Sequence, residues 1–372
     1  MTSRSAGRAP LAFFLPSLEG GGAERVVLNL ASGFAQRGIA TDLVLASAGG
    51  PHLSLVPPDV RVVDLKASRM LRSLRPLTAY LRRERPMVLL AALDHANLVA
   101  MAASRLAGGR TRTAISIHCT FPRNIPGTTT FNERAIPWLL GRLHRWADAI
   151  IAVSGGVADD LAGTTGIPRN RIDVIYNPVI TPALLPSALE RPSHPWFEDS
   201  AGPIVLGVGR LVAQKNFRLL IEAFAIVKRD HNARLVILGE GPERFVLEEH
   251  IRRHGLRDSV ALPGFLENPY ACMARAAVFA LSSDFEGLPT VLIESLAVGT
   301  PVVSTDCESG PREILRGGVL GELIPVGDIP AMARAIARAI TSPRPAPPPE
   351  ALRPFTLDVV LDQFQEAFRL DA

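Results

Sequence analysis

Short apolar runs alternate with helical patterns along the whole chain. Between the runs, apolar positions recur every three to four residues, for example in 23–36, 132–146, 216–228, 242–253 and 290–298. Glycines at 38, 255 and 299 stand where such helices would end. Continuous apolar strands separated by helices are typical of parallel sheets that are covered on both faces. The runs that read as buried strands are 11–15, 42–46, 60–65, 87–93, 113–118, 149–154, 204–208, 234–238, 259–262, 278–281 and 301–304.

Two irregular stretches divide this pattern. Residues 181–202 are rich in proline and lack strong periodicity, so we predict a linker there. A second stretch, 342–349, precedes an amphipathic helix near 357–370. The sequence therefore predicts an N-terminal Rossmann-like domain (1–180), the linker (181–202), a C-terminal Rossmann-like domain (203–345) and a helical end (346–372), for which packing back on the N-terminal domain is one arrangement. Active sites of open α/β sheets lie at the carboxyl ends of strands, so we expect the site in a cleft where the two sheets face each other.

Composition excludes several classes of protein. Hydrophobic residues make up 47% and charged residues 20% of the chain, which excludes disorder as the main state. The net charge of +4 is too small to indicate nucleic-acid binding. Three widely separated cysteines without a CxxC pair indicate a cytosolic protein with neither a disulfide framework nor a zinc site. The N-terminal apolar run suits a buried strand better than a signal peptide, and we expect no membrane span.

Positive charge is concentrated in the first half of the chain, where residues 1–180 carry a net +9. A solvated arginine-rich helix face is the plain interpretation of the most basic segment, 66–85. Docking on an anionic membrane surface is the sharper one, with about 1 kcal/mol for each basic residue. Nucleic-acid binding is weaker, because only Tyr80 offers a ring for stacking. The apolar side chains interleaved with the basic ones are Met70, Leu71, Leu74, Leu77 and Leu81.

The first candidate motif is a glycine-rich turn, Glu-Gly-Gly-Gly-Ala-Glu at 19–24, between the first strand and a helix. Gly21 and Gly22 allow close approach of a ligand to the backbone, and the helix start offers N–H groups to a phosphate or sugar. A tight strand-to-helix turn is the alternative. The motif is neither GxGxxG nor a P-loop, which excludes nicotinamide dehydrogenases and P-loop enzymes here.

The second motif follows the first strand after the predicted linker and reads GVGRLVAQKN (207–216). Arg210 and Lys215 both fall in the strand-to-helix loop, where two cations can clamp a diphosphate. Lys215 is one of only three lysines in a chain with 40 basic residues, so its presence is notable. Two unrelated surface cations are the alternative.

The third motif is the most specific and reads SSDFEGLPTVLIE (282–294). A strand ends, a turn of Glu286, Gly287, Leu288 and Pro289 follows, and a helix begins whose first amides form an anion site. Glu286 would lie toward the reacting end of a ligand, and Glu294 toward a diol. An acid in the first turn plus a solvated glutamate is the alternative for either residue alone.

These motifs together resemble retaining glycosyltransferases of family 4, which have the GT-B fold. LVILGEGPER (235–244) and AVGTPVVSTDCESGPREIL (297–315) strengthen the resemblance, and EGGGAERVVLNLASGF (19–34) resembles the glycine loop and first helix of the family. The resemblance covers nearly the whole chain and is most specific in the C-terminal half.

The resemblance implies a nucleotide-sugar donor in the C-terminal domain and an acceptor in the N-terminal domain. Arg210 and Lys215 match the pyrophosphate-binding pair, Glu294 the carboxylate on the ribose, and Glu286 the acid on the hydroxyls of the transferred sugar. Gly287, Leu288 and Pro289 match the donor-binding turn, while Gly21 and Gly22 match a loop that closes over the diphosphate. His118 matches a histidine beside the donor sugar, although a lone histidine at a strand end is as often structural. No DxD motif occurs, so we expect neither a metal nor a cofactor.

We therefore expect a hexosyltransferase that uses a nucleotide-sugar, preferably UDP-linked. The acceptor would be a lipid-linked or polysaccharide intermediate of envelope glycans such as lipopolysaccharide. The enzyme would act in the bacterial cytoplasm, peripherally at the inner face of the membrane, without nucleic acid. A nucleotide-sugar epimerase and a non-catalytic sugar- or nucleotide-binding protein are the alternatives. Segment 119–130 is interpreted either as a loop over the acceptor or as an inert loop.

Overall fold

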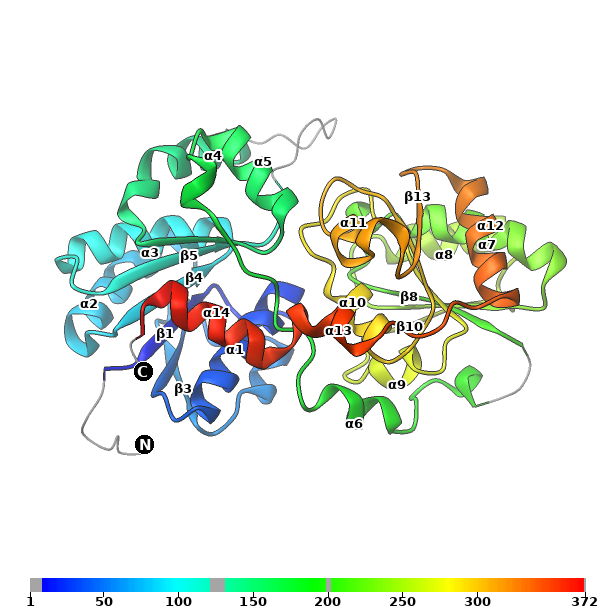
Figure 1. Cartoon of the computed structure of the whole chain (residues 1–372), viewed down its shortest axis with the longest axis horizontal. Coiled ribbons are helices and arrows are strands. Elements are labelled where there is room, and N and C mark those ends of the chain that lie inside the picture. The colour runs from blue at the N-terminus through cyan, green and yellow to red at the C-terminus, as the bar shows by residue number, and fades with distance from the viewer. Residues whose placement is uncertain (1–8, 121–130, 199–201, 371–372) are drawn as a thin grey trace. The chain divides into compact units, whose positions relative to one another are not determined.

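The computed structural model describes residues 9–120, 131–198 and 202–370 and divides into two compact units (Figure 1). Unit 1 consists of Met1–Pro178 and Leu357–Ala372, and unit 2 of Val179–Thr356. Each unit has its own parallel sheet and its own hydrophobic core. The fold is therefore α/β with two Rossmann-like domains, as the strand and helix pattern predicts.

Unit 1 contains a sheet of seven parallel strands in the order β3-β2-β1-β4-β5-β6-β7. The strands β1, β2 and β4 are buried along their whole length, because helices cover both faces of the sheet; this explains their continuous apolar sequences. The strands are β1 (Leu11–Leu15), β2 (Thr41–Leu45), β3 (Val60–Asp64), β4 (Val88–Ala92), β5 (Arg112–Ile117), β6 (Ala149–Ala152) and β7 (Asp173–Val174).

The helices of unit 1 alternate with these strands, except that the last one comes from the end of the chain. Short 3₁₀ turns lie at η1 (Pro51–Leu55), η2 (Met70–Ser73), η3 (His144–Trp146) and η4 (Arg169–Arg171). The α-helices are α1 (Gly22–Gln36), α2 (Leu74–Glu84), α3 (Asp94–Ala107), α4 (Phe131–Leu143), α5 (Gly155–Thr165) and α14 (Leu357–Phe368).

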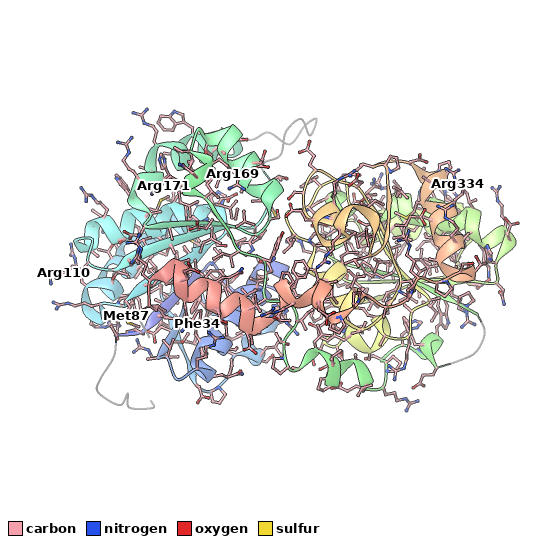
Figure 2. All side chains as sticks on the ribbon, viewed as in Figure 1. Phe34, Met87, Arg110, Arg169, Arg171 and Arg334 are labelled. Carbon is pink, nitrogen blue, oxygen red and sulfur yellow. The ribbon has the colours of Figure 1, made fainter. Side chains whose placement is uncertain are left out.

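Helix α14 packs closely against α1. Phe34 of α1, labelled in Figure 2, contacts Phe13 of β1 and Phe368 of α14, with ring centroids 6.1 and 6.2 Å apart. A Cβ atom at Gly33 would lie only 2.6 Å from Cδ1 of Leu361, so glycine permits this close approach. The end of the chain thus completes the core of unit 1.

Unit 2 contains six parallel strands in the order β10-β9-β8-β11-β12-β13. They are β8 (Ile204–Val208), β9 (Arg234–Leu238), β10 (Val260–Gly264), β11 (Val278–Leu281), β12 (Val302–Thr305) and β13 (Glu322–Ile324). The helices are α6 (Leu184–Leu189), α7 (Phe217–Asp230), α8 (Arg244–Arg253), α9 (Tyr270–Met273), α10 (Thr290–Ala297), α11 (Pro311–Ile314), α12 (Ile329–Thr341) and α13 (Pro349–Leu352). The strand order reverses between β8 and β11, which in open α/β sheets is where ligands bind.

The division into units differs from the expected one at the linker. Segment 181–202 belongs to unit 2 and includes helix α6 and the 3₁₀ turn η5 (Pro195–Phe197). The amide Nδ2 of Asn268, just before α9, donates to the backbone oxygen of Ser187 over 2.8 Å, which fixes α6. The sequence did not predict this packed segment, because its prolines interrupt the helical periodicity. They do not prevent a short helix of six residues.

Individual strands lie where the apolar runs indicate, and three glycines follow helix ends in the left-handed region: Gly38, Gly255 and Gly299, at φ of 77°, 68° and 84°. The segment 119–130 lies outside the described residues except for Cys119 and Thr120. Among the helices that are described, none is both long and apolar enough to cross a membrane.

Candidate active site

The loops after β8 and β11 meet at the point where the strand order of unit 2 reverses. The first loop contains Arg210, the 3₁₀ turn η6 (Ala213–Lys215) and Asn216, and the second contains residues 282–289. Both loops leave the carboxyl ends of neighbouring strands, as the parallel pairing of Val278 with Val205 shows. The second and third sequence motifs thus form one edge of the sheet.

Lys215 and Glu286 form the central contact of this edge. The Lys215 Nζ atom lies 2.5 Å from Oε1 of Glu286, and the hydroxyl of Ser283 donates to the same oxygen over 2.7 Å. The side chains are only 18% and 7% exposed, so the ion pair is largely removed from water. Removing one member of a buried pair leaves the other uncompensated, which makes this pair costly to disrupt.

Hydrogen bonds between the two loops fix the position of the ion pair. The amide Nδ2 of Asn216 donates to Asp284 Oδ1 over 2.8 Å, and Nε2 of Gln214 donates to the backbone oxygen of Phe285 over 2.8 Å. Asn216 has a φ of 44° and caps α7 by accepting from the backbone amide of Leu219. The residues on both sides of Lys215, Gln214 and Asn216, are therefore hydrogen-bonded to the loop after β11, which fixes the position of Lys215.

The turn of Glu286 to Pro289 is supported by a glycine that lies outside the three sequence motifs. Gly310 has a φ of 88°, and a Cβ atom there would lie 2.6 Å from Pro289 Cδ and 2.9 Å from the oxygen of Gly287. The hydroxyl of Ser309 donates to that same oxygen over 2.9 Å. Gly310 thus allows the loop after β12 to pack directly beneath the turn.

Cys307 also belongs to this loop and is buried. Burial, and next the charge of Glu286, raise the pKa of the Cys307 thiol to about 12. The thiol is thus protonated at neutral pH and is no nucleophile.

Glu294 lies on α10, one helix turn and a half beyond the turn that contains Glu286. It is buried, and its Oε1 accepts a hydrogen bond of 3.3 Å from the hydroxyl of Tyr270 on α9. A solvated helix glutamate, the plain alternative, is therefore excluded for this residue. Tyr270 was not found from the sequence, because its 24-residue separation from Glu294 leaves no local pattern.

Arg210 differs from Lys215 in its surroundings. It is exposed, and within the described ranges its guanidinium has no hydrogen bond or ion pair. Its five donors are available to a ligand at the same edge as Lys215.

In unit 1, the glycine loop and His118 follow β1 and β5. Gly21 caps α1, and its amide donates to Oε2 of Glu24 over 2.6 Å, while Gly22 is the first helical residue. His118 Nε2 lies 3.0 Å from the hydroxyl of Ser116. Burial lowers the pKa of His118 to about 4, so the ring is uncharged at neutral pH.

Asp94 is a further candidate that the sequence pattern did not single out. It follows Leu93, a non-glycine residue with a φ of 78°, directly after β4 at the switch point of the sheet of unit 1. Burial raises the pKa of Asp94 to about 6. Backbone strain beside a perturbed carboxyl is typical of functional sites, and the available signal was the polar Asp-His interruption of an apolar run.

GT-B glycosyltransferases consist of two Rossmann-like units. Their functional residues lie on loops at the carboxyl ends of the strands, as the candidate residues do here. Solved structures of that class share the fold. The apo form of the lipopolysaccharide outer core galactosyltransferase WaaB has a TM-score of 0.71 at 21% identity, over 97% of this chain and 99% of that chain. Anabaena Alr3699/HepE in complex with UDP and glucose has a TM-score of 0.76 at 21% identity, over 98% and 100%.

The chain belongs to the family 4 type of glycosyltransferases. Residues 20–181 match the family described as Glycosyltransferase Family 4, and residues 190–353 match Glycosyl transferases group 1. Over 88% of both chains it is 33% identical to the N-acetylgalactosamine-N,N'-diacetylbacillosaminyl-diphospho-undecaprenol 4-alpha-N-acetylgalactosaminyltransferase of Campylobacter jejuni. It is 29% identical, over 86% of both chains, to the lipopolysaccharide core biosynthesis glycosyltransferase LpsE of Rhizobium meliloti.

The Campylobacter relative is named as a glycosyltransferase that acts on a diphospho-undecaprenol-linked glycan, and the Rhizobium relative as one of lipopolysaccharide core biosynthesis. Both names favour sugar transfer over the epimerase and the non-catalytic binder.

Proposed function

We propose that this glycosyltransferase moves a hexose-type sugar, preferably from a UDP-sugar, to a lipid-linked or polysaccharide acceptor of the bacterial envelope, with retention of the anomeric configuration. The observation that carries the proposal is the buried Lys215–Glu286 pair at the switch point of unit 2. Such a pair offers a cation for a leaving diphosphate and a carboxylate for sugar hydroxyls, side by side.

Stabilisation of the leaving group falls to Arg210, Lys215 and the first amides of α10. Arg210 supplies a planar fork for two phosphate oxygens, and Lys215 supplies a compact point charge. Helix-end amides add fixed partial positive charge where negative charge develops. Because no DxD motif occurs in the sequence, we propose that these groups act without a metal and without a cofactor.

The two glutamates orient the donor. Glu286, held by Ser283, would accept hydrogen bonds from hydroxyls of the transferred sugar. Glu294, held by Tyr270, would accept them from the ribose, and Gly287, Leu288 and Pro289 would line the turn between. In this scheme Glu286 forms no covalent intermediate.

Transfer occurs at one face of the donor sugar. The bond between the anomeric carbon and the diphosphate oxygen breaks as the acceptor oxygen forms its bond to the same carbon. The acceptor hydroxyl gives its proton to the departing phosphate, so the products are the glycoside and the nucleoside diphosphate. Retention follows because the nucleophile enters from the side that the leaving group vacates.

Residues of unit 1 serve the acceptor and the donor sugar. Gly21 and Gly22 would approach the diphosphate, and the uncharged ring of His118 would bond a sugar hydroxyl. Asp94, whose pKa burial raises to about 6, would position the acceptor hydroxyl.

The similar proteins guide the choice of substrates. The Campylobacter relative is named for transfer of N-acetylgalactosamine to a diphospho-undecaprenol-linked sugar, and HepE structures contain UDP or UDP-glucose. We extend both features to this chain as a UDP-sugar donor and a lipid-linked acceptor.

An activity assay tests this proposal. Purified enzyme is incubated with UDP-N-acetylgalactosamine, UDP-glucose or UDP-galactose and detergent-solubilised lipid-linked glycans, in EDTA, and both UDP release and the anomeric coupling of the product are measured. We expect UDP release that depends on the acceptor and a product with the anomeric configuration of the donor. An inverted product, or turnover that EDTA abolishes, would contradict retention or metal independence, respectively.

Only some of the apolar side chains in the basic segment 66–85 are exposed. Leu77 and Leu81 belong to the buried core, so they are not available to a membrane. Leu71, in contrast, is 81% exposed and is flanked by the exposed side chains of Arg69 and Arg72. We propose that this end of the segment, η2 and the start of α2, docks the enzyme peripherally on the anionic inner face of the membrane.

Vesicle sedimentation tests the docking. The triple variant Arg69→Glu/Arg72→Glu/Arg75→Glu should lose most of its binding to phosphatidylglycerol vesicles. Arg334→Glu, an exposed charge reversal on α12 in unit 2, should bind like the wild type. Equal binding of the triple variant and the wild type would mean that the arginines are only a solvated face.

A further inference from the structure

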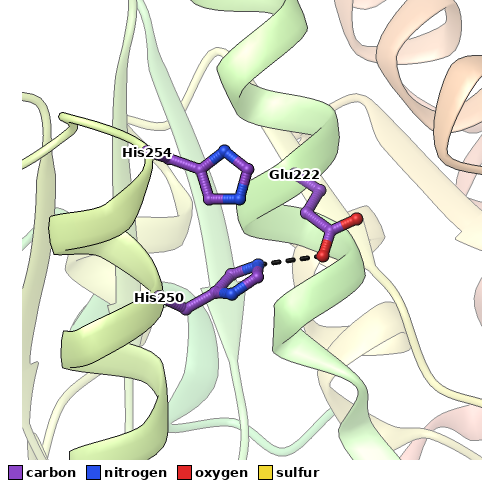
Figure 3. Close-up of side chains that lie close together, drawn as sticks. All are labelled: Glu222, His250 and His254. Atoms are coloured by element: carbon purple, nitrogen blue, oxygen red, sulfur yellow. Dashed lines mark ion pairs between the residues drawn. The ribbon is translucent and has the colours of Figure 1, made fainter.

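Three side chains of unit 2 that belong to residue types able to ligate a metal lie close together where α7 meets α8 (Figure 3). Glu222 comes from α7, His250 from α8, and His254 from the residue that directly follows α8. One potential ligand atom from each lies within 4.8 Å of the other two. Figure 3 shows both imidazole rings directed from α8 toward Glu222.

The spacing of the histidines suits a metal ion. His250 and His254 are four residues apart, which places them on one face of a helix, and their ring centroids are 4.7 Å apart. The amide of His254 donates to the oxygen of His250 over 3.2 Å, so the helical turn continues through both residues. Histidine pairs at this spacing provide two ligands in helical zinc sites.

One ring nitrogen is buried in an unsatisfied position. Nε2 of His250 lies 2.9 Å from Oε1 of Glu222, yet it has no hydrogen bond of acceptable geometry among the described residues. Buried polar atoms without a hydrogen bond are uncommon in folded proteins. An ion coordinated between the ring and the carboxylate would satisfy this atom.

The distances require only small movements. In a tetrahedral zinc site with bonds of about 2.0–2.1 Å, ligand atoms lie about 3.3 Å apart. The contact between His250 and Glu222 would open slightly, and the exposed His254 would move inward by a rotamer change. The neighbouring Arg252 and Arg253 both pair with Glu249, so they do not compete for Glu222.

We propose that Glu222, His250 and His254 form a site for a divalent transition-metal ion such as Zn²⁺, with water in the remaining position. Two imidazoles and one carboxylate are ligands that zinc prefers. The ion would link α7 to α8 and stabilise unit 2. This site is independent of the proposed sugar transfer, because its ligands lie on α7, on α8 and directly after α8, and not on the loops after β8 and β11. The widely spaced cysteines had indicated no zinc site, and none of them takes part.

Zinc binding to the tag-free full-length chain tests the proposal. After treatment with a chelator and its removal, the protein is titrated with ZnCl₂ in a calorimeter. We expect one equivalent to bind, and we expect at least tenfold weaker binding for His254→Ala and for Glu222→Gln. His231→Ala, a histidine variant at the end of α7, and Cys119→Ser, which removes an exposed thiol, should match the wild type.

Two further measurements, thermal unfolding with circular dichroism and Co²⁺ absorption, distinguish loss of the metal site from loss of the folded structure. Zn²⁺ should raise the thermal unfolding temperature of the wild type but not of His254→Ala, whose circular dichroism should be unchanged because His254 is exposed. Co²⁺ should give visible absorption bands of low-coordinate nitrogen and oxygen ligation only where His254 is present. Undiminished zinc affinity in His254→Ala, or no binding to the wild type at 100-fold excess, would overturn the proposal.

Discussion

Lys215 and Glu286 form an ion pair that is largely removed from water. In a complex with a nucleotide-sugar, Lys215 would instead contact the diphosphate and Glu286 the sugar hydroxyls. A diphosphate would compete for the ammonium of Lys215 and release one oxygen of Glu286, while Ser283 still donates to that oxygen. The pair thereby keeps two opposite charges compensated until a ligand with its own charge and hydroxyls replaces the contact.

Substituting Glu286 by glutamine removes the negative charge of the side chain but keeps its size and shape. Glu286→Gln should keep the hydrogen bond with Lys215 but lose the negative charge near the reacting sugar. We expect UDP affinity within about threefold of the wild type and a kcat at least about 100-fold lower, the scale found when one electrostatic contact to a transition state is removed. Steady-state kinetics and UDP binding measure the two effects. The exposed surface variant Glu248→Gln should change neither.

His118 should make the stability of unit 1 depend on pH. Because burial lowers its pKa to about 4 from 6.5, the unfolded chain binds a proton that the folded chain does not, between these pH values. The free energy of unfolding should therefore fall as the pH drops from 7 to 5. Asp94, with its pKa raised to about 6, acts in the opposite direction.

The contribution of His118 is isolated by comparing variants at both pH values. His118→Asn should lose less thermal stability than the wild type between pH 7 and pH 5, with Asp94 intact in both. A His118→Asn profile that runs parallel to the wild type would show that His118 titrates normally in the folded protein.

At the scale of elements, the proposed donor site consists of the loops after β8 and β11, and neighbouring loops and helices hold these two loops in place. The turn before α10 rests on Gly310, the loop after β8 is bonded to the loop after β11, and Tyr270 of α9 supports α10. Positions of the functional side chains thus depend on contacts between loops that are distant in sequence.

The support from Gly310 can be tested against a matched glycine. Gly310→Ala places a Cβ atom 2.6 Å from Cδ of Pro289, whereas Gly317, which also has a positive φ, has nothing within 4 Å of such an atom. Gly317→Ala should lose about 1 kcal/mol of stability through backbone strain, and Gly310→Ala should lose more, because its ψ of −66° lies outside the left-handed helical region. Only Gly310→Ala should weaken UDP binding, by at least tenfold, as measured by calorimetry. Equal UDP affinities of the two variants would mean that the turn tolerates displacement.

At the scale of the whole molecule, the end of the chain belongs to the unit in which the chain begins. Leu361 of α14 is buried against Gly33 of α1, and Phe364 and Phe368 extend this contact along the helix. The last helix is thus part of the core of unit 1, although all of unit 2 separates it from α1 in sequence.

Shortening Leu361 should destabilise unit 1. Leu361→Ala removes buried methyl groups from a packed core, which costs about 2–5 kcal/mol. Asp358→Ala, at a side chain that is 92% exposed on the same helix, should cost less than about 0.5 kcal/mol. Urea unfolding followed by tryptophan fluorescence measures both. An effect of Leu361→Ala as small as that of Asp358→Ala would contradict the docking of α14.

Sequence patterns predicted the fold class well, because buried parallel strands such as β1 and β8 are continuous apolar runs. The strands β7 and β13 were missed, since both are very short and only partly buried. The position of Glu286 in a turn and of Glu294 in the following helix was predicted from local motifs. The support from Ser309, Tyr270 and Gly310 was not, because it depends on tertiary packing. The role of each site residue stays a prediction.

The most direct test is calorimetric titration of UDP, GDP and ADP, with and without a linked hexose, in the presence of EDTA. We predict that the wild type binds UDP and UDP-sugars selectively and that Arg210→Ala/Lys215→Ala weakens this binding at least 100-fold while the protein remains folded. Binding of UDP with equal affinity to the wild type and the double variant would contradict a donor site at the edge formed by β8 and β11.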